Sequence, residues 1–353
     1  MNDYKVSVFI GRFQPLHNSH LEVIRHALSI SDKLILILGS ANSAPTIKNP
    51  FSFETRSDLI RASLTPNESD RVIIVPVRDY HYNDNTWVAD IQAKTDPYIN
   101  DGDTVALVGN YKDSSSYYLK YFPQWEFVPA PNSTKLDAST VRDLLFNVNP
   151  ETHGVTELVL KPADLSKLKS LVPKSVFTFL KEFVNTRAYT DLVEEYNFIK
   201  EYKKRWKSAP YAPTFVTTDA VVTCSGHVLV IKRKFNPGKG LYALPGGFIR
   251  QDERIRDAAI RELKEETGIK VDKIILDSSV VDSKVFDHPG RSLRGRTVTH
   301  GFHIKLKDGK LPEIKANDDA LIAQWMPLMD VGKNEPIFYE DHSHIIHYFI
   351  NKL

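Results

Sequence analysis

The chain has 353 residues, and its 46 lysines and arginines against 44 aspartates and glutamates give a formal net charge of +2. That length predicts two or three domains, and the balanced charge gives no reason to expect a nucleic-acid or membrane partner. Cys224 is the only cysteine, which excludes an intrachain disulfide and a cysteine-rich zinc site. We find no signal peptide, and the longest apolar runs are strand-sized. We therefore expect a cytoplasmic, soluble protein.

The first half of the chain alternates strand-like runs with helical or irregular stretches. The runs are VSVFI (6–10), KLILILGS (33–40), RVIIVPV (71–77) and TVALVGN (104–110). Such alternation predicts a parallel sheet with crossover helices.

Residues 11–20, GRFQPLHNSH, connect the first run to a segment with apolar residues at helical spacing. In an open α/β sheet such a turn is where phosphates bind, because a helix N-terminus offers free N–H groups and a positive dipole end. We expect His17 and His20 on one face of the first helical turns, where they can donate to phosphate oxygens. Taken alone, the spacing of His17 and His20 is also compatible with two surface histidines in a loop.

Two further stretches follow strands in the same way. They are NPFSFETR (49–56) and LDASTVRDLL (136–145). In the second, Ser139 and Thr140 are expected at helix N-cap positions, with Arg142 in the first turn. That arrangement would offer amides, hydroxyls and a guanidinium to phosphates, although an ordinary capped helix explains the residues equally well.

Together the three stretches resemble the HxGH-type nucleotidyltransferases, and most of all the archaeal-type nicotinamide mononucleotide (NMN) adenylyltransferases, over roughly residues 4–185. The resemblance implies a Rossmann-like α/β domain that transfers the adenylyl group of ATP to NMN and releases NAD and pyrophosphate, with Mg²⁺ accompanying ATP. It implies that the ATP phosphates are bound by Gly11, Arg12, Phe13, His17 and His20 on one side and by Ser139, Thr140 and Arg142 on the other.

The sequence departs from this family's pattern at two positions. Ser19 stands where the family has a glycine, and Thr55 separates Glu54 from Arg56. We expect Arg56 to keep the role of the family arginine in binding the nucleotide.

Two more residues are candidates for ligand contacts in this half. The segment DYHYNDNTWVADI (79–91) resembles the family's nicotinamide pocket, which implies that Trp87 stacks on the ring; packing in the core is the alternative. Lys112 lies in GNYKDSSSYYLKYFPQW (109–125), after the fourth apparent strand. From there it could reach a phosphate, or it is a solvated lysine.

The pattern changes after about residue 165. Two amphipathic helices are expected, then SAPYAP (208–213) breaks the helix. We assign residues 1–190 to the first domain, 191–212 to a linker and 213–353 to a second domain. The second domain reads as α+β, with two strands around a Ser-Gly turn, a glycine-rich turn, a helix at 253–267 and further strands.

The predicted helix of the second domain carries three carboxylates on one side. Glu262, Glu265 and Glu266 are spaced i, i+3 and i+4, so their like charges repel. A divalent cation resolves that repulsion, and Mg²⁺ prefers such oxygen ligands, with Mn²⁺ as an alternative. We expect Arg261 to hold these carboxylates in place. Ile260 and Leu263, on the opposite side, are expected to pack on a sheet.

This helix lies inside a longer pattern, GGFIRQDERIRDAAIRELKEETGI (246–269). It matches without a gap the signature of the Nudix hydrolases, G-x5-E-x7-R-E-U-x-E-E-x-G-U. The resemblance implies a mixed sheet with a catalytic loop–helix–loop that hydrolyses a nucleoside diphosphate linked to another group. It implies that Glu262, Glu265 and Glu266 bind Mg²⁺ and that Glu253 and Arg261 shape the loop–helix–loop. Gly246 and Gly247 allow close approach to a phosphate or metal.

The segments FDHPGRSLRGRTVTHGF (286–302) and KANDDALIAQWMPL (315–328) resemble the ADP-ribose-cleaving branch of that family. This resemblance implies hydrolysis of ADP-ribose to AMP and ribose 5-phosphate. Arg291, Arg294 and Arg296 would form a cationic loop that meets the diphosphate, and a solvated loop is the alternative.

In this order the two halves resemble the bifunctional NMN adenylyltransferase/Nudix hydrolases. The expected partners are therefore ATP, NMN, NAD and ADP-ribose, with no nucleic acid and no membrane, and a homo-oligomer is compatible with the sequence. Two alternatives stay open. One is a nucleotidyltransferase for another acceptor fused to a Nudix domain of other specificity. The other is a Nudix-type metabolite sensor, which would typically lack box carboxylates and carry a basic DNA-binding element.

Overall fold

The structure is a computed structural model that describes residues 3–110, 114–131, 136–148, 150–151, 159–160 and 165–350. Its internal contacts divide the chain into two units, Met1–Tyr196 and Asn197–Leu353. The division falls inside one helix, α7 (Arg187–Arg205), which includes most of the residues assigned to a linker from the sequence. None of the helices in the described part of the chain has the length and apolar content that crossing a membrane requires.

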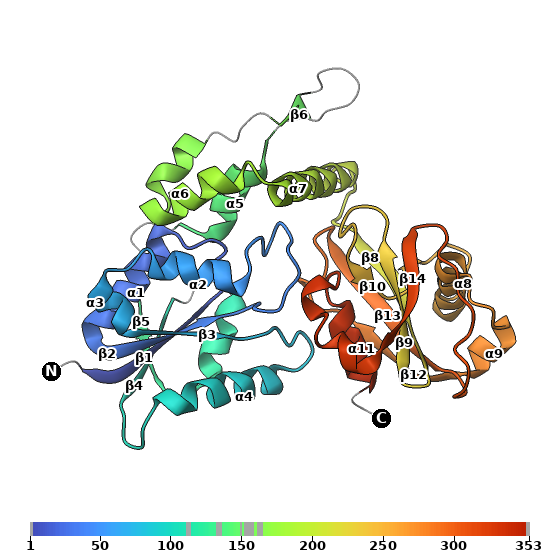
Figure 1. Ribbon diagram of the computed structural model, residues 1–353, viewed down its shortest axis with the longest axis horizontal. Helices are drawn as coiled ribbons and strands as arrows, with labels where there is room; N and C mark the ends of the chain where they lie inside the picture. The colour runs from blue at the N-terminus through green and yellow to red at the C-terminus, as the bar shows by residue number, and fades with distance from the viewer. Residues whose placement is uncertain are drawn as a thin grey trace. The chain divides into compact units, whose positions relative to one another are not determined.

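The first unit is built on a five-stranded sheet (Figure 1). Its strands are β1 (Tyr4–Gly11), β2 (Ser31–Leu38), β3 (Val72–Pro76), β4 (Val105–Gly109) and β5 (Glu126–Pro129). Their order is β3-β2-β1-β4-β5 and every pairing is parallel, which confirms the predicted parallel sheet. The chain order reverses between β1 and β4, and ligands bind such sheets outside the carboxyl ends of the strands at that switch point.

Both faces of this sheet are buried, which explains why its strands are almost wholly apolar. Val6 and Val8 contribute to one apolar cluster together with Ile91, whereas Phe9 contributes to the other with Val141. The alternation follows the two-residue period of a strand. The covering helices are α1 (Asn18–Ile30), α2 (Phe53–Arg61), α3 (Pro66–Asp70), α4 (Asp84–Thr95), α5 (Ala138–Phe146) and α6 (Lys174–Phe183). Short 3-10 helices span Asp96–Tyr98, Ser114–Tyr121 and Leu165–Ser170, and Pro150–Glu151 (β6) pairs with Val159–Leu160 (β7).

The second unit is built on a mixed sheet, as expected from the sequence. Its strands are β8 (Thr214–Cys224), β9 (His227–Arg233), β10 (Tyr242–Ala243), β11 (Gly246–Phe248), β12 (Val280–Phe286), β13 (Arg296–Lys305) and β14 (Ala320–Pro327). β13 pairs with β8 in parallel, and the other pairings are antiparallel.

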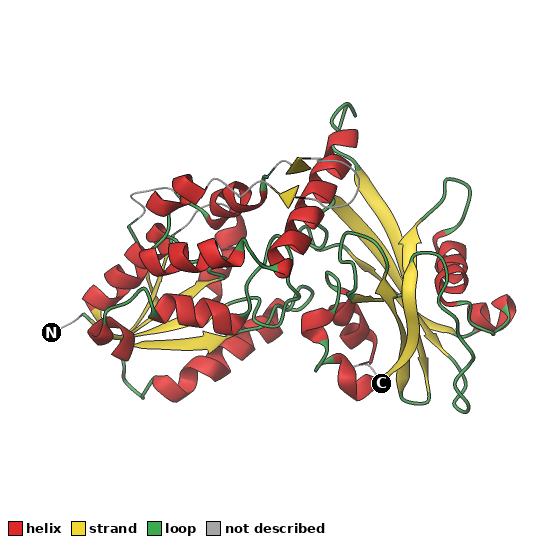
Figure 2. Ribbon diagram, turned by 45° about the horizontal axis from the view of Figure 1, so that its top comes forward, coloured by secondary structure: helices red, strands yellow, loops and turns green. Residues whose placement is uncertain are grey.

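Helices lie on both faces of this mixed sheet. They are α8 (Ile255–Thr267), α9 (Lys273–Ser278), α10 (Leu328–Val331) and α11 (His342–Ile350), and Glu335–Ile337 forms a 3-10 helix. α8 and α11 lie on opposite faces in both views (Figures 1 and 2). Ile260 and Leu263 of α8 pack in one cluster with Val222 of β8, as predicted. This packing fixes which side of α8 remains for its carboxylates.

Candidate active sites

A cavity of about 280 Å³ opens at the switch point of the first unit. Of the sequence-predicted residues it brings together Gly11, Arg12, Phe13, His17, His20, Ser139 and Arg142. The end of β4 contributes Gly109 and Asn110. One cavity is therefore lined by residues from three segments that are far apart in the sequence, 11–20, 109–110 and 136–142.

The turn after β1 folds back on itself. Phe13 has a left-handed backbone with φ of 52° and is buried, and its ring lies over Gly11. A Cβ atom on Gly11 would lie 2.9 Å from that ring, so a glycine is needed there. His17 immediately precedes α1, and its ring stacks on that of His20 with centroids 3.6 Å apart. The i, i+3 spacing thus places both imidazoles on one wall of the cavity, as predicted.

Gln14 is a cavity residue that sequence reasoning missed. Its side chain is 1% exposed and exchanges two hydrogen bonds with the backbone of Phe51, with Nε2 donating at 2.8 Å and Oε1 accepting at 3.0 Å. Its own carbonyl accepts from Arg142 Nη1 at 2.8 Å. Gln14 therefore ties the β1 turn to both other motifs. The only signal for it in the sequence is a polar residue between Phe13 and a proline.

The start of α5 differs from the prediction. Asp137 is the N-cap residue, and its carboxylate accepts from the amide of Thr140 at 2.7 Å and from the Thr140 hydroxyl at 3.0 Å. Ser139 and Thr140 lie inside the first turn instead, and Thr140 does not line the cavity. The carboxylate displaces the two hydroxyls from the cap because it is a strong acceptor for orphan amides. Arg142 consequently lies in the second turn.

Arg142 is a buried cation at the cavity. It is 9% exposed and donates to Ser139 Oγ at 3.1 Å. Burial, and secondarily the charge of neighbouring Arg12, lower the pKa of Arg142 to about 10. It therefore stays charged at neutral pH, and an anion in the cavity would offset the cost of burying it.

Arg56 has a different position from the one expected. Its side chain is 1% exposed and does not line the cavity. It donates to the carbonyls of Arg12 at 2.6 Å, Gly39 at 2.8 Å, Ser40 at 3.3 Å and Ser52 at 3.1 Å. Because its donors are used by backbone carbonyls, Arg56 holds the turns after β1 and β2 together rather than facing a phosphate.

Of the remaining two candidates of this unit, Trp87 does not line the cavity. Trp87 of α4 is half-buried and packs edge-on against Tyr118 and Phe122, at centroid distances of 5.8 and 6.1 Å. Lys112 lies outside the described residues.

In the second unit, Arg261 of α8 is at the centre of the carboxylate group. It donates to both oxygens of Glu253 at 2.6 and 2.9 Å, to Glu262 at 2.7 Å and to Glu265 at 2.8 Å. The hydrogen bonds from Arg261 lower the pKa of Glu253 to about 2. Arg261 therefore holds the neighbouring carboxylates, as the sequence led us to expect.

Glu266 is the buried carboxylate of this group, at 5% exposure. Burial is the main reason that its pKa rises to about 8, and the charge of Glu262 adds to the rise. Its Oε2 accepts from the amide of Gly246 at 3.0 Å. A Cβ atom on Gly247 would lie 2.7 Å from the Glu262 carboxyl, so glycine permits β11 to lie directly against the acidic helix.

The residues fit a divalent cation by their chemistry. Within the described ranges, no three side chains among Asp, Glu, His and Cys converge as the ligands of a metal ion do. Arg261 instead holds Glu262 and Glu265. A buried carboxyl with a raised pKa beside two further carboxylates is nevertheless an oxygen donor set of the kind that Mg²⁺ and Mn²⁺ bind.

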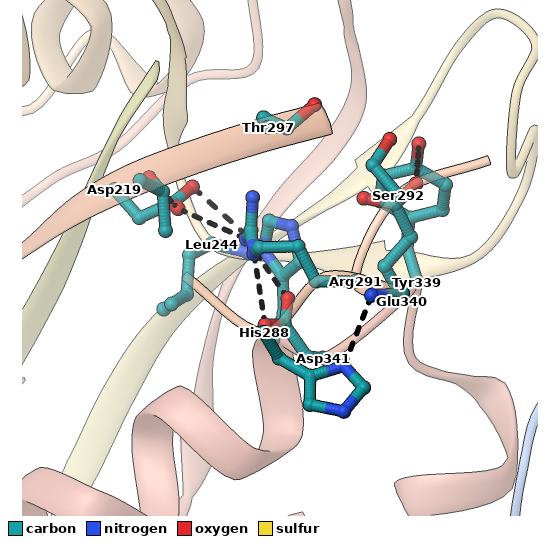
Figure 3. A network of polar contacts seen from close by, with 12 residues as sticks. Asp219, Leu244, His288, Arg291, Ser292, Thr297, Tyr339, Glu340 and Asp341 are labelled. Carbon is teal, nitrogen blue, oxygen red and sulfur yellow. Dashed lines mark hydrogen bonds and ion pairs between the residues drawn. The ribbon is translucent and has the colours of Figure 1, made fainter. Parts of the chain in front are cut away.

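The three predicted arginines of the cationic loop separate in the structure. Arg291 is 5% exposed and pairs with both oxygens of Asp341 at 2.9 Å each, so it does not form part of an exposed cationic surface (Figure 3). Arg296 donates to the carbonyl of Asp287. Of the three, Arg294 reaches the segment 246–254 before α8, which begins with β11 and which we name the Nudix loop. The Arg294 guanidinium lies 5.1 Å from the centroid of the Phe248 ring.

Arg233 is a second residue that sequence reasoning missed. It ends β9, and its guanidinium lies 4.3 Å from the centroid of the Tyr339 ring. Its charge opposes the rise in the pKa of Glu266, which places a cation near the buried carboxylate. The basic run IKRK before the glycine-rich turn was the signal that could have identified it.

Comparisons with known proteins match the two units separately and together. Residues 8–129 match the cytidylyltransferase-like family model, and residues 213–349 match the NUDIX domain model. A nicotinamide/nicotinic acid mononucleotide adenylyltransferase of Acinetobacter baylyi is 33% identical over 56% of this chain and 95% of its own length. An ADP-ribose pyrophosphatase of Methanocaldococcus jannaschii is 36% identical over 38% of this chain and 73% of its own length.

The comparisons include a solved structure that covers both units. It is a bifunctional NMN adenylyltransferase/ADP ribose pyrophosphatase from Francisella tularensis, complexed with AMP and a manganese ion. It is 38% identical to this chain and aligns with a TM-score of 0.88 over 99% of each chain.

Proposed function

The chain belongs to the family of bifunctional NMN adenylyltransferases/ADP-ribose pyrophosphatases, and from that premise we propose that it makes NAD in its first unit and hydrolyses ADP-ribose in its second. The observation that carries the proposal is the pairing of two dissimilar sites on one chain. One is a cationic cavity at a sheet switch point, and the other is an acidic helix whose carboxylates lie against a glycine loop.

In the first unit, a phosphate oxygen of NMN attacks the α-phosphorus of ATP. The bond from that phosphorus to the bridging oxygen breaks, and pyrophosphate leaves. The chain's residues align the two phosphates and stabilise the charge that develops on the leaving group. We assign that stabilisation to His17, His20, Arg12 and Arg142, because all four line the cavity. Ser139 and the backbone of the β1 turn complete the phosphate contacts.

In the second unit, a divalent cation would supply an activated water and neutralise charge on the diphosphate. Glu262, Glu265 and Glu266 would hold it, with Gly246 and Gly247 allowing the loop to approach. Glu253 and Arg261 orient these carboxylates. Arg294 and Arg233 provide the positive charge for the diphosphate. The Francisella relative carries manganese, and for this chain we propose Mg²⁺ or Mn²⁺.

The test is a product analysis with the full chain. NMN, ATP and Mg²⁺ are expected to give NAD and pyrophosphate, and ADP-ribose is expected to give AMP and ribose 5-phosphate. Nicotinate mononucleotide is run beside NMN, since the Acinetobacter relative is named for both acceptors. Absence of any dinucleotide from a protein that binds ATP would refute the first activity. If ADP-ribose is not hydrolysed with Mg²⁺ or with Mn²⁺, the second activity is refuted. The cytoplasmic location expected from the sequence belongs to the same proposal, because these substrates are soluble metabolites.

A further inference from the structure

Residues 291–294, which we name the arginine loop, are held by the two residues that precede α11. Arg291 donates from Nε and Nη2 to the two oxygens of Asp341, at 2.9 Å each. Two residues further along the loop, the amide of Leu293 donates to Glu340 Oε1 at 3.4 Å. Figure 3 shows Arg291, Asp341 and Glu340 in one polar network. The loop is therefore clamped at two of its four residues.

The same guanidinium is anchored to the sheet. Arg291 Nη2 lies 3.9 Å from Asp219 Oδ2 on β8, and that oxygen accepts from the Thr299 hydroxyl at 2.6 Å. Arg291 is 5% exposed and Asp341 is 1% exposed, so the pair is removed from solvent. Burial alone would lower the pKa of Arg291, but the carboxylates of Asp341 and Asp219 raise it above its ordinary value. Arg291 therefore stays charged at neutral pH.

The network continues from the clamp to the Nudix loop. Ser292 Oγ accepts from the amide of Arg294 at 3.4 Å and from its Nε at 3.5 Å. The Arg294 guanidinium then lies 5.1 Å from the centroid of Phe248, the residue that follows Gly247. Gly247 in turn lies against the carboxyl of Glu262. A short chain of contacts thus leads from a buried ion pair to a partly exposed cation beside the acidic helix.

We propose that Arg291 and Asp341 are positioning residues that hold Arg294 over the Nudix loop, where Arg294 binds the diphosphate of the substrate. This inference rests on the proposed hydrolysis of a nucleoside diphosphate in the second unit. Arg291 does not contact the substrate, because its guanidinium is committed to Asp341. A free arginine side chain loses rotamer freedom when it binds a phosphate. Fixing Arg294 in advance removes part of that cost, which is the benefit of preorganisation.

A double-mutant cycle distinguishes positioning from general support of the fold. Arg294→Ala is expected to raise KM for ADP-ribose about tenfold, with kcat within about threefold, because it removes one charge-assisted contact. Asp341→Asn is expected to raise KM by a similar factor. The double variant should be no worse than Arg294→Ala alone, since Asp341 acts through Arg294. Additive effects on KM, or an unchanged KM in the single Asp341→Asn variant, would overturn the proposal.

The cycle is run at a temperature at which circular dichroism shows each variant to be folded. If Asp341→Asn does not fold, Ser292→Ala carries the same test, because it removes only the acceptor for Arg294. The matched control is Arg256→Gln, which breaks an exposed ion pair with Asp277 at 2.6 Å and should leave KM unchanged. Mn²⁺ affinity should be the same in all variants. A loss of Mn²⁺ affinity would show that the network acts on the metal loop instead and would contradict the proposal.

A second readout does not depend on substrate. Hydrogen exchange of the peptide that covers residues 288–298 should be faster in Asp341→Asn than in the wild type and unchanged in Arg256→Gln. If the wild type does not hydrolyse ADP-ribose, the proposed function fails, and this exchange measurement still decides whether Asp341 holds the loop. Equal exchange in the wild type and Asp341→Asn would refute the clamp.

Discussion

The amide of Gly246 donates to the carboxylate of Glu266 at 3.0 Å, while the Glu266 side chain is 5% exposed. One backbone donor offsets only part of the cost of burying a carboxylate, and Glu262 adds repulsion. Burial, with the charge of Glu262 adding to its effect, therefore raises the pKa of Glu266 to about 8 despite the hydrogen bond from Gly246. The metal-free site therefore holds a carboxyl that is protonated over part of the neutral range.

This relationship predicts how stability depends on pH in metal-free buffer. The folded pKa of about 8 lies above the ordinary value of 4.5, so the stability contributed by the neutral form is fully present below pH 4.5 and is lost as pH rises through 8. Glu266→Gln keeps an acceptor for Gly246 but cannot ionise. It should raise the unfolding temperature of the second unit by several degrees at pH 8.5 and leave it unchanged at pH 4.5. Calorimetry in EDTA measures this, and equal temperatures at pH 8.5 would contradict it.

We expect substitution of Arg56 to lower the stability of the first unit strongly, although Arg56 does not line the cavity. Arg56→Lys removes most of the bonds to four backbone carbonyls and leaves buried acceptors unpaired, at a cost of about 2–4 kcal/mol in the free energy of unfolding. The control is Arg61→Lys, since Arg61 is exposed on the same helix, α2. Urea unfolding monitored on the first unit gives the comparison. Equal midpoints for the two variants would be inconsistent with this role.

The cap of α5 gives a second test in the first unit. Asp137→Ala should lower the unfolding free energy by about 1 kcal/mol, the usual cost of losing an N-cap. Ser139→Ala should cost less, because Ser139 lies inside the helix, yet it should raise KM for ATP, because its hydroxyl is at the cavity. The free energy of unfolding is measured for both variants, and KM for ATP is measured for Ser139→Ala, because Asp137 itself also lines the cavity. A larger loss of stability in Ser139→Ala than in Asp137→Ala would contradict the observed cap.

We expect substitution of Gly247 to impair only the acidic site of the second unit. A Cβ atom there would lie 2.7 Å from the Glu262 carboxyl, so Gly247→Ala must displace the carboxylate or the loop. Mn²⁺ affinity, measured by calorimetry, should fall about tenfold or more, the effect expected for a disturbed ligand sphere. Gly332→Ala is the control, since its φ of −64° is ordinary and its nearest neighbour would be 3.9 Å away. Unchanged Mn²⁺ binding in Gly247→Ala would argue against a metal at this loop.

The fold was largely predictable because its strongest constraints are local. Strands buried on both faces read as continuous apolar runs, and α8 carries its carboxylates and its apolar side at fixed helical spacing. Both properties are visible in a short window of sequence. The side-by-side placement of His17 and His20 was predictable for the same reason.

Arg291 and Arg56 lie in positions that differ from the expected ones, because their hydrogen-bond partners are distant in the sequence. Arg291 pairs with Asp341, which is fifty positions away in the sequence. The guanidinium of Arg56 donates its hydrogen bonds to carbonyls of two other turns. For Arg291, the sequence left a ligand-binding and a solvated loop as alternatives. For Arg56, the resemblance to the adenylyltransferases implied a role in binding the nucleotide. At α5 the error was local: Asp137 stood two residues before Ser139, and the stronger acceptor took the cap.

The central claim is that one chain carries two independent active sites. Its most direct test measures NAD formation and ADP-ribose hydrolysis side by side in two variants of the full chain. His20→Ala is expected to lower adenylyl transfer by about a hundredfold or more, as removal of a preorganised donor does, with hydrolysis unchanged. Glu266→Gln is expected to abolish hydrolysis and leave adenylyl transfer within about threefold. A folded variant of either kind that loses both activities would contradict the two-site account.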